Sequence, residues 1–245
     1  MNEKKLKQTA FSFIPDVQMQ RQDFMVSNCN QEAFAYIDSW PKWIANGLVI
    51  YGPKGSGKTH LAHLFAEKVS ILSSKPQKIP FYDCQQINLN NVQRVCDSSD
   101  IIILENLTER IDEEALFHLF NHFNIQGRYM LWTSLKAPAR INLKLKDLHS
   151  RLDTLPAVEI KEPDDLMLRA LVLKLFDDRQ LLISPEILEY IINNTERSFA
   201  KIEKLVQEID EISLAYKSTV NYKIVKTALE KLKQETEREP YLFDF

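Results

Sequence analysis

Five short apolar runs, separated by stretches with helical periodicity, make up most of the first two thirds of the chain. They cover residues 47–51, 79–83, 100–104, 128–133 and 157–160. Between most of them the apolar positions recur every three or four residues, as in "DEEALFHLFNHF", where Leu116, Leu119, Phe120 and Phe123 share one helical face. Alternating strands and helices predict an α/β fold, with a five-stranded parallel sheet flanked by helices.

The pattern changes after "KEPDD", at about residue 165, where no further strand is indicated. Ser184 followed by Pro185 is a typical helix start. Apolar residues at helical spacing predict four helices, over 165–180, 185–194, 199–216 and 222–235. We therefore expect a small four-helix domain after the sheet. The proposed division of the chain is an arm at 1–15, a nucleotide-binding domain at 16–163, a helical domain at 164–236 and a tail at 237–245.

The stretch "IYGPKGSGKTHLAHLF" joins the first apolar run to a helical pattern and fits the P-loop spacing G-x-x-x-x-G-K-[ST]. Its glycines let successive backbone N–H groups point into one concavity, which favours an anion at the start of the following helix. Lys58 adds a positive charge for the terminal phosphates, and the Thr59 hydroxyl is placed to reach Mg²⁺. The strand before it and the helix after it disfavour a glycine loop without function. The expected nucleotide-binding residues are Gly52, Pro53, Lys54, Gly55, Ser56, Gly57, Lys58, Thr59 and His60.

The third apolar run, in "SSDIIILENL", is followed by polar residues. P-loop hydrolases usually place an acid at the end of such a strand, where it holds magnesium. Glu105 is the candidate for that role, together with Thr59, although an exposed glutamate at a strand end is an alternative reading. Asn106 follows as a candidate catalytic residue; an amide does not accept a proton at neutral pH, but it can orient a water molecule.

Composition narrows the classes of function. The 245 residues are 44% apolar and 27% charged, which is typical of a soluble globular protein. With 31 basic and 34 acidic residues the net charge is −3, so the overall charge does not favour nucleic-acid binding, although a local basic patch stays open. The first residues, "MNEKKLKQ", lack an apolar core, and no run has membrane-spanning length, so we expect a cytoplasmic protein without membrane contact. Cys29, Cys84 and Cys96 show no metal-ligand spacing and no obvious pairing.

Together, "GPKGSGKTHLAHLF", "SSDIIILENL", "LKAPARINLKLKDLHSRLD" and the four-helix end resemble the AAA+ domain of the DnaA family of replication initiators, most closely its short, Hda-like regulators. The resemblance covers nearly the whole chain. It implies an AAA+ P-loop domain with a helical lid that binds ADP or ATP with Mg²⁺. It also places Phe24 and Val26, in "DFMVSNCNQEAFAYI", against the adenine base. Simple core packing explains these two residues equally well.

The same resemblance makes Arg151 in "SRLD" an arginine finger, which would act in trans on the γ-phosphate held by a neighbouring subunit. A solvated surface arginine is the alternative. Three positions depart from the family's pattern: Asn106, Leu135 in place of a polar sensor after the fourth strand, and Ala200 in place of the lid arginine. Thr133 and Ser134 are the available substitutes for the polar sensor. Arg197 or Lys201 could replace the lid arginine, although neither falls in register. The resemblance therefore implies slow hydrolysis of the chain's own nucleotide.

The first residues contain "QTAFSF", which is similar to the motif by which proteins dock on the DNA polymerase sliding clamp. Gln8 would fix the register, and Phe11 and Phe13 would fill an apolar pocket as the arm orders on binding. The motif is short, and Phe11 stands where leucine is commoner. The initiators of the family continue into a helix-turn-helix domain that this sequence lacks, so we do not expect sequence-specific duplex binding through such a domain. The aromatic end "EPYLFDF" either packs on the lid or extends to a partner.

Together the resemblance implies a regulator that binds adenine nucleotide and the sliding clamp (beta subunit), contacts DNA indirectly through the clamp, and stimulates hydrolysis of DnaA-bound ATP. It would thereby limit initiation of replication. Homo-oligomers are compatible with this role. Two alternatives belong to other classes: a self-acting AAA+ ATPase such as a helicase loader, and a passive adaptor that binds DnaA or DNA without stimulating hydrolysis.

Overall fold

The computed structural model describes residues 24–73 and 78–238 and contains one five-stranded sheet. All neighbouring strands run parallel, in the order β2-β3-β4-β1-β5. The strands are β1 (Gly47–Tyr51), β2 (Phe81–Asp83), β3 (Ile101–Leu107), β4 (Tyr129–Ser134) and β5 (Ala157–Glu159). The predicted parallel α/β fold is therefore confirmed. β3 extends three residues beyond its predicted end and takes in Glu105 and Asn106, with a break in register between Leu104 and Leu107.

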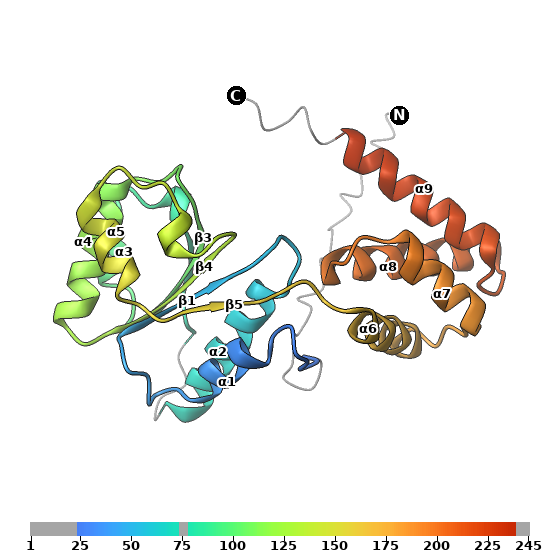
Figure 1. Cartoon of the computed structure of the whole chain (residues 1–245), viewed down its shortest axis with the longest axis horizontal. Coiled ribbons are helices and arrows are strands. Elements are labelled where there is room, and N and C mark those ends of the chain that lie inside the picture. The colour runs from blue at the N-terminus through green and yellow to red at the C-terminus, as the bar shows by residue number, and fades with distance from the viewer. Residues whose placement is uncertain (1–23, 74–77, 239–245) are drawn as a thin grey trace, which may run out of the picture.

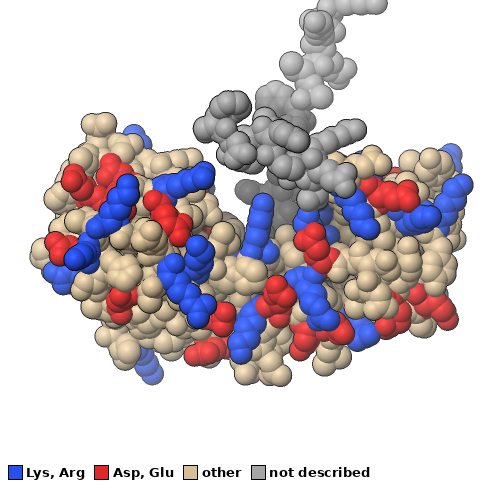
Figure 2. Space-filling view, turned by 45° about the horizontal axis from the view of Figure 1, so that its top comes forward, with Lys and Arg blue, Asp and Glu red and all other residues tan. Residues whose placement is uncertain are grey.

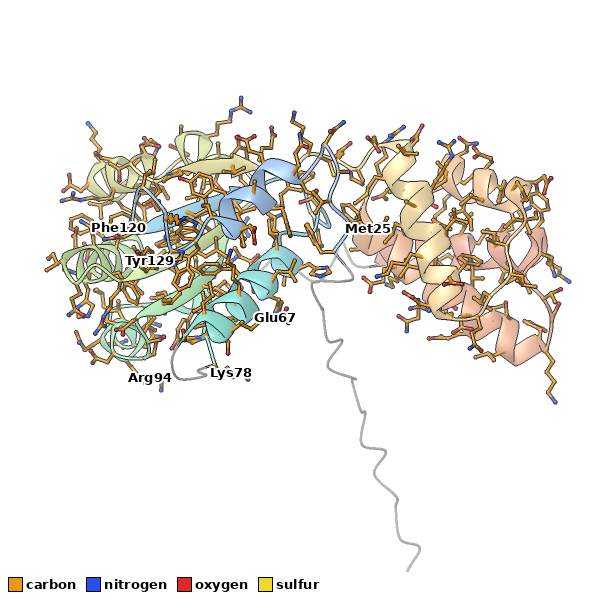
Figure 3. All side chains as sticks on the ribbon, turned by 90° about the horizontal axis from the view of Figure 1, so that it is seen from below. Met25, Glu67, Lys78, Arg94, Phe120 and Tyr129 are labelled. Atoms are coloured by element: carbon orange, nitrogen blue, oxygen red, sulfur yellow. The ribbon has the colours of Figure 1, made fainter. Side chains whose placement is uncertain are left out.

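Helices cover both faces of this sheet (Figure 1). The helices and 3₁₀ turns of this part are α1 (Gln31–Asp38), α2 (Lys58–Leu72), η2 (Cys84–Gln86), α3 (Val92–Cys96), α4 (Glu113–Ile125), η3 (Pro138–Arg140) and α5 (Lys146–Asp153). Figure 3 labels Glu67 on α2 and Phe120 on α4, which lie on opposite sides of the sheet. This arrangement follows from the strands, whose successive side chains point to opposite faces.

Two separate apolar layers result from that alternation. Leu48 and Ile50 of β1 pack with Phe65 of α2 in a layer that also holds α1, here called the α1–α2 layer. Val49, between them, packs with Trp132 and with side chains of α3, α4 and α5 in the α3–α5 layer. β3 divides in the same way, since Ile101 and Ile103 belong to the first layer and Ile102 and Leu104 to the second. The nearly continuous apolar runs of the sequence therefore correspond to strands buried on both faces.

Four helices follow β5 and form a bundle with its own core, here called the lid (Figure 1). The lid helices are α6 (Asp165–Asp178), α7 (Pro185–Asn194), α8 (Phe199–Tyr216) and α9 (Tyr222–Arg238). The predicted cap is present, because the Ser184 hydroxyl accepts a hydrogen bond from the Ile187 amide. Ile202, Leu205, Val206 and Ile209 of α8 are fully buried, as their spacing predicts.

Charged side chains of both signs are interspersed over both parts of the molecule on the face shown in Figure 2. This matches the small net charge of −3. None of the helices in the described part of the chain is both long and apolar enough to span a membrane.

Candidate functional site

The phosphate loop, residues 52–57, connects β1 to α2 at the edge of the sheet where the strands end. Gly52 has φ +154°, and a Cβ atom there would lie 2.1 Å from the Ile160 carbonyl oxygen, so no other residue fits. Gly57 precedes α2, whose first turn contains Lys58 and Thr59. The first amides of a helix have no partner within the helix, so this end of α2 presents N–H donors to an anion.

Lys58 reaches back over the loop. Its Nζ donates to the carbonyl oxygens of Gly52, at 2.8 Å, and Pro53, at 2.7 Å. Burial lowers the pKa of Lys58, while the charge of Glu105 acts in the opposite direction. A bound phosphate would add a second negative group beside this ammonium and favour its charged form. The lysine therefore lies within the loop whose ligand it was predicted to contact.

The Ser56 hydroxyl is the clearest sign that the loop is shaped for a ligand. Ser56 is 2% exposed, and its Oγ is buried without a hydrogen-bond partner in the described part of the chain. Buried hydroxyls are nearly always satisfied, so an orphan inside a phosphate loop fits a site completed by an anionic acceptor. Lys54, by contrast, is exposed.

The Thr59 hydroxyl donates a hydrogen bond of 2.7 Å to Oε1 of Glu105. Mg²⁺ prefers oxygen ligands and usually binds through one or two carboxylates together with substrate phosphates and water. A hydroxyl and a carboxylate beside a phosphate loop fit that requirement. Within residues 24–73 and 78–238, no group of three or more His, Cys, Asp or Glu side chains is arranged to hold a metal by itself.

Asn106, next to Glu105, has φ +59° and lies in the register break of β3. Its Nδ2 donates to Oδ2 of Asp83 at 2.7 Å, and its backbone amide donates to the Thr133 hydroxyl at 3.4 Å. Asp83 is the last residue of β2 and pairs in register with Glu105. Sequence reasoning overlooked Asp83. The available signal was its position, since it is the last residue of the second predicted strand and Glu105 directly follows the third.

The end of β4 carries the positions considered as polar sensors. Thr133 and Ser134 are buried; the first accepts the Asn106 amide and the second donates its hydroxyl proton to the Lys136 carbonyl. Leu135 is 55% exposed. Both hydroxyls are thus engaged by the chain itself, and Leu135 offers only an apolar side chain.

Aromatic side chains border the phosphate loop on the side of α1. The Phe24 ring stacks on Phe34 at 5.7 Å between centroids and meets His60 edge to face at 5.2 Å. Phe24 also comes within 4.0 Å of the position of a Cβ on Gly57. Val26 is 49% exposed. Met25, between the two, lies in the segment that passes between the sheet and the lid (Figure 3). Phe24 is therefore both packed against the core and next to the loop, which joins the two predicted explanations for it.

The lid contacts the phosphate loop directly, which the sequence did not reveal. The Phe199 amide, at the start of α8, donates to the Gly55 carbonyl at 3.0 Å. Gly55 has φ +73°, and a Cβ there would lie 2.2 Å from the Ser198 hydroxyl and 3.2 Å from Cβ of Ala200. Ala200 is thus next to the loop, in the place that the resemblance gives to the lid arginine.

The two cations considered as substitutes for that arginine are engaged within the lid. Arg197 forms an ion pair of 2.7 Å with Asp165, and Lys201 lies 4.0 Å from Glu196. Their positive charges are therefore partly balanced away from the loop.

Arg151 is exposed in the last turn of α5. Leu148 and Leu152 hold that helix in the α3–α5 layer. The Arg151 guanidinium forms no hydrogen bond or ion pair with the residues that the structure describes. Gln8, Phe11 and Phe13 lie outside the described residues, as does the end "EPYLFDF" of the tail.

Comparison with known proteins identifies a family. The model of the bacterial DnaA ATPase domain matches residues 17–158. The chromosomal replication initiator protein DnaA of Flavobacterium psychrophilum is 27% identical over 211 residues, which are 79% of this chain and 44% of that protein. The chain thus spans less than half of this curated relative.

Solved structures agree with the fold. Domain III of the replication initiation protein DnaA from Thermotoga maritima superimposes with a TM-score of 0.74 at 18% identity, over 88% of this chain and 97% of that one. AMPPCP-bound DnaA from Aquifex aeolicus gives a TM-score of 0.66 at 18% identity, over 89% and 68% of the two chains.

Proposed function

The chain belongs to the bacterial DnaA ATPase family, and on that premise we propose that it is an Hda-like regulator of replication initiation. In this role it binds adenine nucleotide in its own phosphate loop and docks on the DNA sliding clamp. From there it stimulates hydrolysis of the ATP bound by DnaA and so restrains initiation.

The position of Arg151 carries the proposal. The phosphate loop follows β1 at the edge where the parallel strands end. Arg151 lies in the last turn of α5, just before the start of β5. Because β5 runs parallel to β1, its start is at the end of the sheet opposite to the phosphate loop (Figure 1). An exposed guanidinium there is separated from the chain's own phosphate loop by the length of the strands, and we propose that it acts on another subunit's nucleotide. Supplied in trans, an arginine that stabilises the charge of the transition state is worth on the order of 10³–10⁵ in rate.

The nucleotide site supports binding with slow turnover. Lys58 and the buried Ser56 hydroxyl are placed to bind phosphates. The Thr59–Glu105 pair is placed to bind Mg²⁺. The solved DnaA relative that carries AMPPCP agrees with an adenine nucleotide here. Asn106, Leu135 and Ala200 lack the basic carboxylate, the polar sensor and the positive charge on which phosphoryl transfer depends. ADP is therefore the form that we expect the chain to retain.

The arm and its partners complete the proposal. Gln8, Phe11 and Phe13 bind the beta-subunit clamp, which brings the chain to DNA indirectly, in the cytoplasm. The arm at 1–15, the nucleotide-binding domain at 16–163, the lid at 164–236 and the tail at 237–245 form the functional division. Homo-oligomers would use the same contact between Arg151 and a neighbour's nucleotide.

One alternative function is favoured by a specific observation. Thr59 and Glu105 form a hydroxyl–carboxylate pair of the kind that binds Mg²⁺ together with phosphates, and Asp83 adds a carboxylate close to Asn106. A self-acting AAA+ ATPase, such as a helicase loader, would use these groups on its own ATP. Phosphate release by the purified chain at a rate typical of an AAA+ motor would favour this function over the regulator.

The decisive experiment measures ATP hydrolysis by DnaA with and without this chain and clamp-loaded DNA. The chain should raise DnaA turnover, and Arg151→Ala should remove that stimulation while ADP binding and clamp binding stay unchanged. Lys146→Ala is the matched control, because it removes a cation from another side of the same helix α5. Unchanged stimulation by Arg151→Ala would favour a passive adaptor, and equal loss in both variants would point to the charge of α5 instead of the finger.

A further inference from the structure

The Asp83 carboxylate is fixed through both of its oxygens. Oδ1 accepts a hydrogen bond of 2.8 Å from the Gln85 amide at the start of η2, and Oδ2 accepts the 2.7 Å hydrogen bond from Asn106 Nδ2. Asp83 itself is half-buried at the end of β2. The direction of its second oxygen is therefore set by the backbone of η2.

This carboxylate determines which way the Asn106 amide faces. An ionised carboxylate only accepts hydrogen bonds, so Asn106 must present Nδ2 to Asp83. The Oδ1 atom then faces away from Asp83. It accepts no hydrogen bond from the residues that the structure describes, and Asn106 is exposed. Asn106 thus offers an acceptor oxygen next to Glu105, at the edge of the sheet that carries the phosphate loop.

We propose that Asp83 is a positioning residue of the nucleotide site, which holds Asn106 Oδ1 as the acceptor for the water that attacks the bound nucleotide. The proposal rests on nucleotide binding at the phosphate loop, and it deepens that function by naming what limits hydrolysis. The amide oxygen orients water but takes no proton from it, whereas the Asp83 carboxylate is directed at the amide and not at the water. Turnover is slow because the carboxylate is at position 83 and the amide is at position 106, next to the site.

Exchanging the two side chains tests this order. In Asp83→Asn with Asn106→Asp, the new amide at position 83 still accepts from Gln85 through its oxygen and donates its NH₂ to the new carboxylate at position 106. Every hydrogen bond of the pair is kept, while the carboxylate moves to the position next to the site. When water attacks the γ-phosphorus and the bond to the bridging oxygen breaks, that carboxylate can take the proton that the water loses. General-base catalysis of this kind contributes about 10²–10⁴-fold in rate.

The single variants separate positioning from simple stability. In Asp83→Asn, the new amide oxygen still accepts the hydrogen bond from the Gln85 amide, so its NH₂ group faces Asn106. The Asn106 amide must then turn its oxygen towards position 83 and present its NH₂ donor to the site. In Asn106→Asp, two carboxylates meet at the distance of the present hydrogen bond and the hydrogen bond between them is lost, so this variant should be less stable than the parent.

Single-turnover hydrolysis of ATP bound to the full chain, without DnaA, is the main measurement, with thermal melting beside it. Asp83→Asn should slow hydrolysis about tenfold. Asn106→Asp should melt at a lower temperature than the parent, and the exchange variant should restore the melting temperature and hydrolyse at least about tenfold faster than the parent. Asp112→Asn is the matched control, because Asp112 also accepts hydrogen bonds through both oxygens, in its case from the backbone amides of Ala115 and Leu89, but caps α4. It should lower stability without changing hydrolysis.

Hydrolysis at the parent rate in both Asp83→Asn and the exchange variant would overturn the proposal, as would equal slowing by Asp112→Asn. The assay contains no second protein, so its failure is distinct from failure of the trans action of Arg151. Loss of ATP binding by the parent chain itself would instead remove the function on which the proposal rests.

Discussion

The Thr59 hydroxyl lies 2.7 Å from the Glu105 carboxylate, although β4 separates the strands that lead to these two residues. The contact is made because parallel strands end at one edge of a sheet, where the residues that follow them converge. Three elements therefore supply one polar cluster: Thr59 from the start of α2, Glu105 from β3 and Asp83 from β2.

We predict that Thr59→Val weakens magnesium-dependent nucleotide binding about tenfold, the loss of roughly 1.4 kcal/mol of binding free energy. Valine keeps the shape of threonine and removes the hydroxyl beside the ion. Titration of fluorescent ADP with Mg²⁺ and with a chelator measures the effect, which should vanish in the chelator. Thr227→Val is the control, since the Thr227 hydroxyl donates to the Lys223 carbonyl within helix α9. An equal effect with and without Mg²⁺ would contradict a metal role for Thr59.

Lys58→Ala should remove most of the stabilisation that ADP gives to the folded chain. A ligand at about 100 times its Kd contributes roughly 2.7 kcal/mol, or about 5–10 °C in melting temperature for a chain of this size. Melting curves with and without ADP test this. Lys223→Ala, an exposed lysine on α9, should keep the full shift. A full shift in Lys58→Ala as well would rule out this lysine as a phosphate contact.

The lowered pKa of Lys58 predicts a dependence of ADP affinity on pH. Burial favours the neutral amine and so lowers the pKa of Lys58 in the free protein below its ordinary value of 10.5. A bound phosphate favours the ammonium ion instead. Binding therefore takes up a proton on the alkaline side, and affinity falls as the pH rises through the lowered pKa. Isothermal titration calorimetry in buffers of different ionisation enthalpy measures the proton uptake. Release of protons on binding in this range would have the wrong sign.

Gly55→Ala should open the contact between the lid and the phosphate loop. The new Cβ would meet the Ser198 hydroxyl at 2.2 Å, so α8 has to move or the loop has to change shape. We expect faster dissociation of bound ADP and a lower denaturation midpoint. Gly127→Ala is the matched control, because Gly127 also has positive φ, +66°, but nothing lies within 4 Å of a Cβ there. It should carry only the backbone strain, about 1 kcal/mol, and leave dissociation unchanged.

Replacing Gln8, Phe11 and Phe13 together by alanine should abolish binding to the sliding clamp. The sequence predicts that the arm at 1–15 is no part of the core, so melting temperature and ADP affinity should stay as in the parent. Co-elution with the clamp in size-exclusion chromatography is the measurement. Undiminished co-elution of the triple variant would show that the clamp contact lies elsewhere or does not exist.

Local patterns were enough to predict the sheet and the lid helices. The strand at Gly47–Tyr51 and the helix at Pro185–Asn194 have the predicted bounds, because apolar runs and a serine–proline start act through neighbouring residues. The P-loop motif likewise located Lys58 and Thr59, whose spacing is fixed within one turn of chain.

Contacts between distant segments were not predictable in this way. Asp83 and Asn106 are hydrogen-bonded between the neighbouring strands β2 and β3. Ser198 meets Gly55 only after the lid has folded back on the sheet. Neither pair has a periodicity or a spacing that marks it in the sequence. The extension of β3 through Asn106 also depends on tertiary structure, because its register break is defined against β4.

The separation of the interior into the α1–α2 layer and the α3–α5 layer has a genetic consequence. Lys58 extends from the helix packed in the first layer, and Arg151 from a helix packed in the second. Temperature-sensitive alleles that loosen one layer should therefore fall into two phenotypic groups. One group loses its own nucleotide at the restrictive temperature, whereas the other keeps the nucleotide and fails to act on its partner. Such alleles would allow the two activities to be switched off one at a time in a living cell.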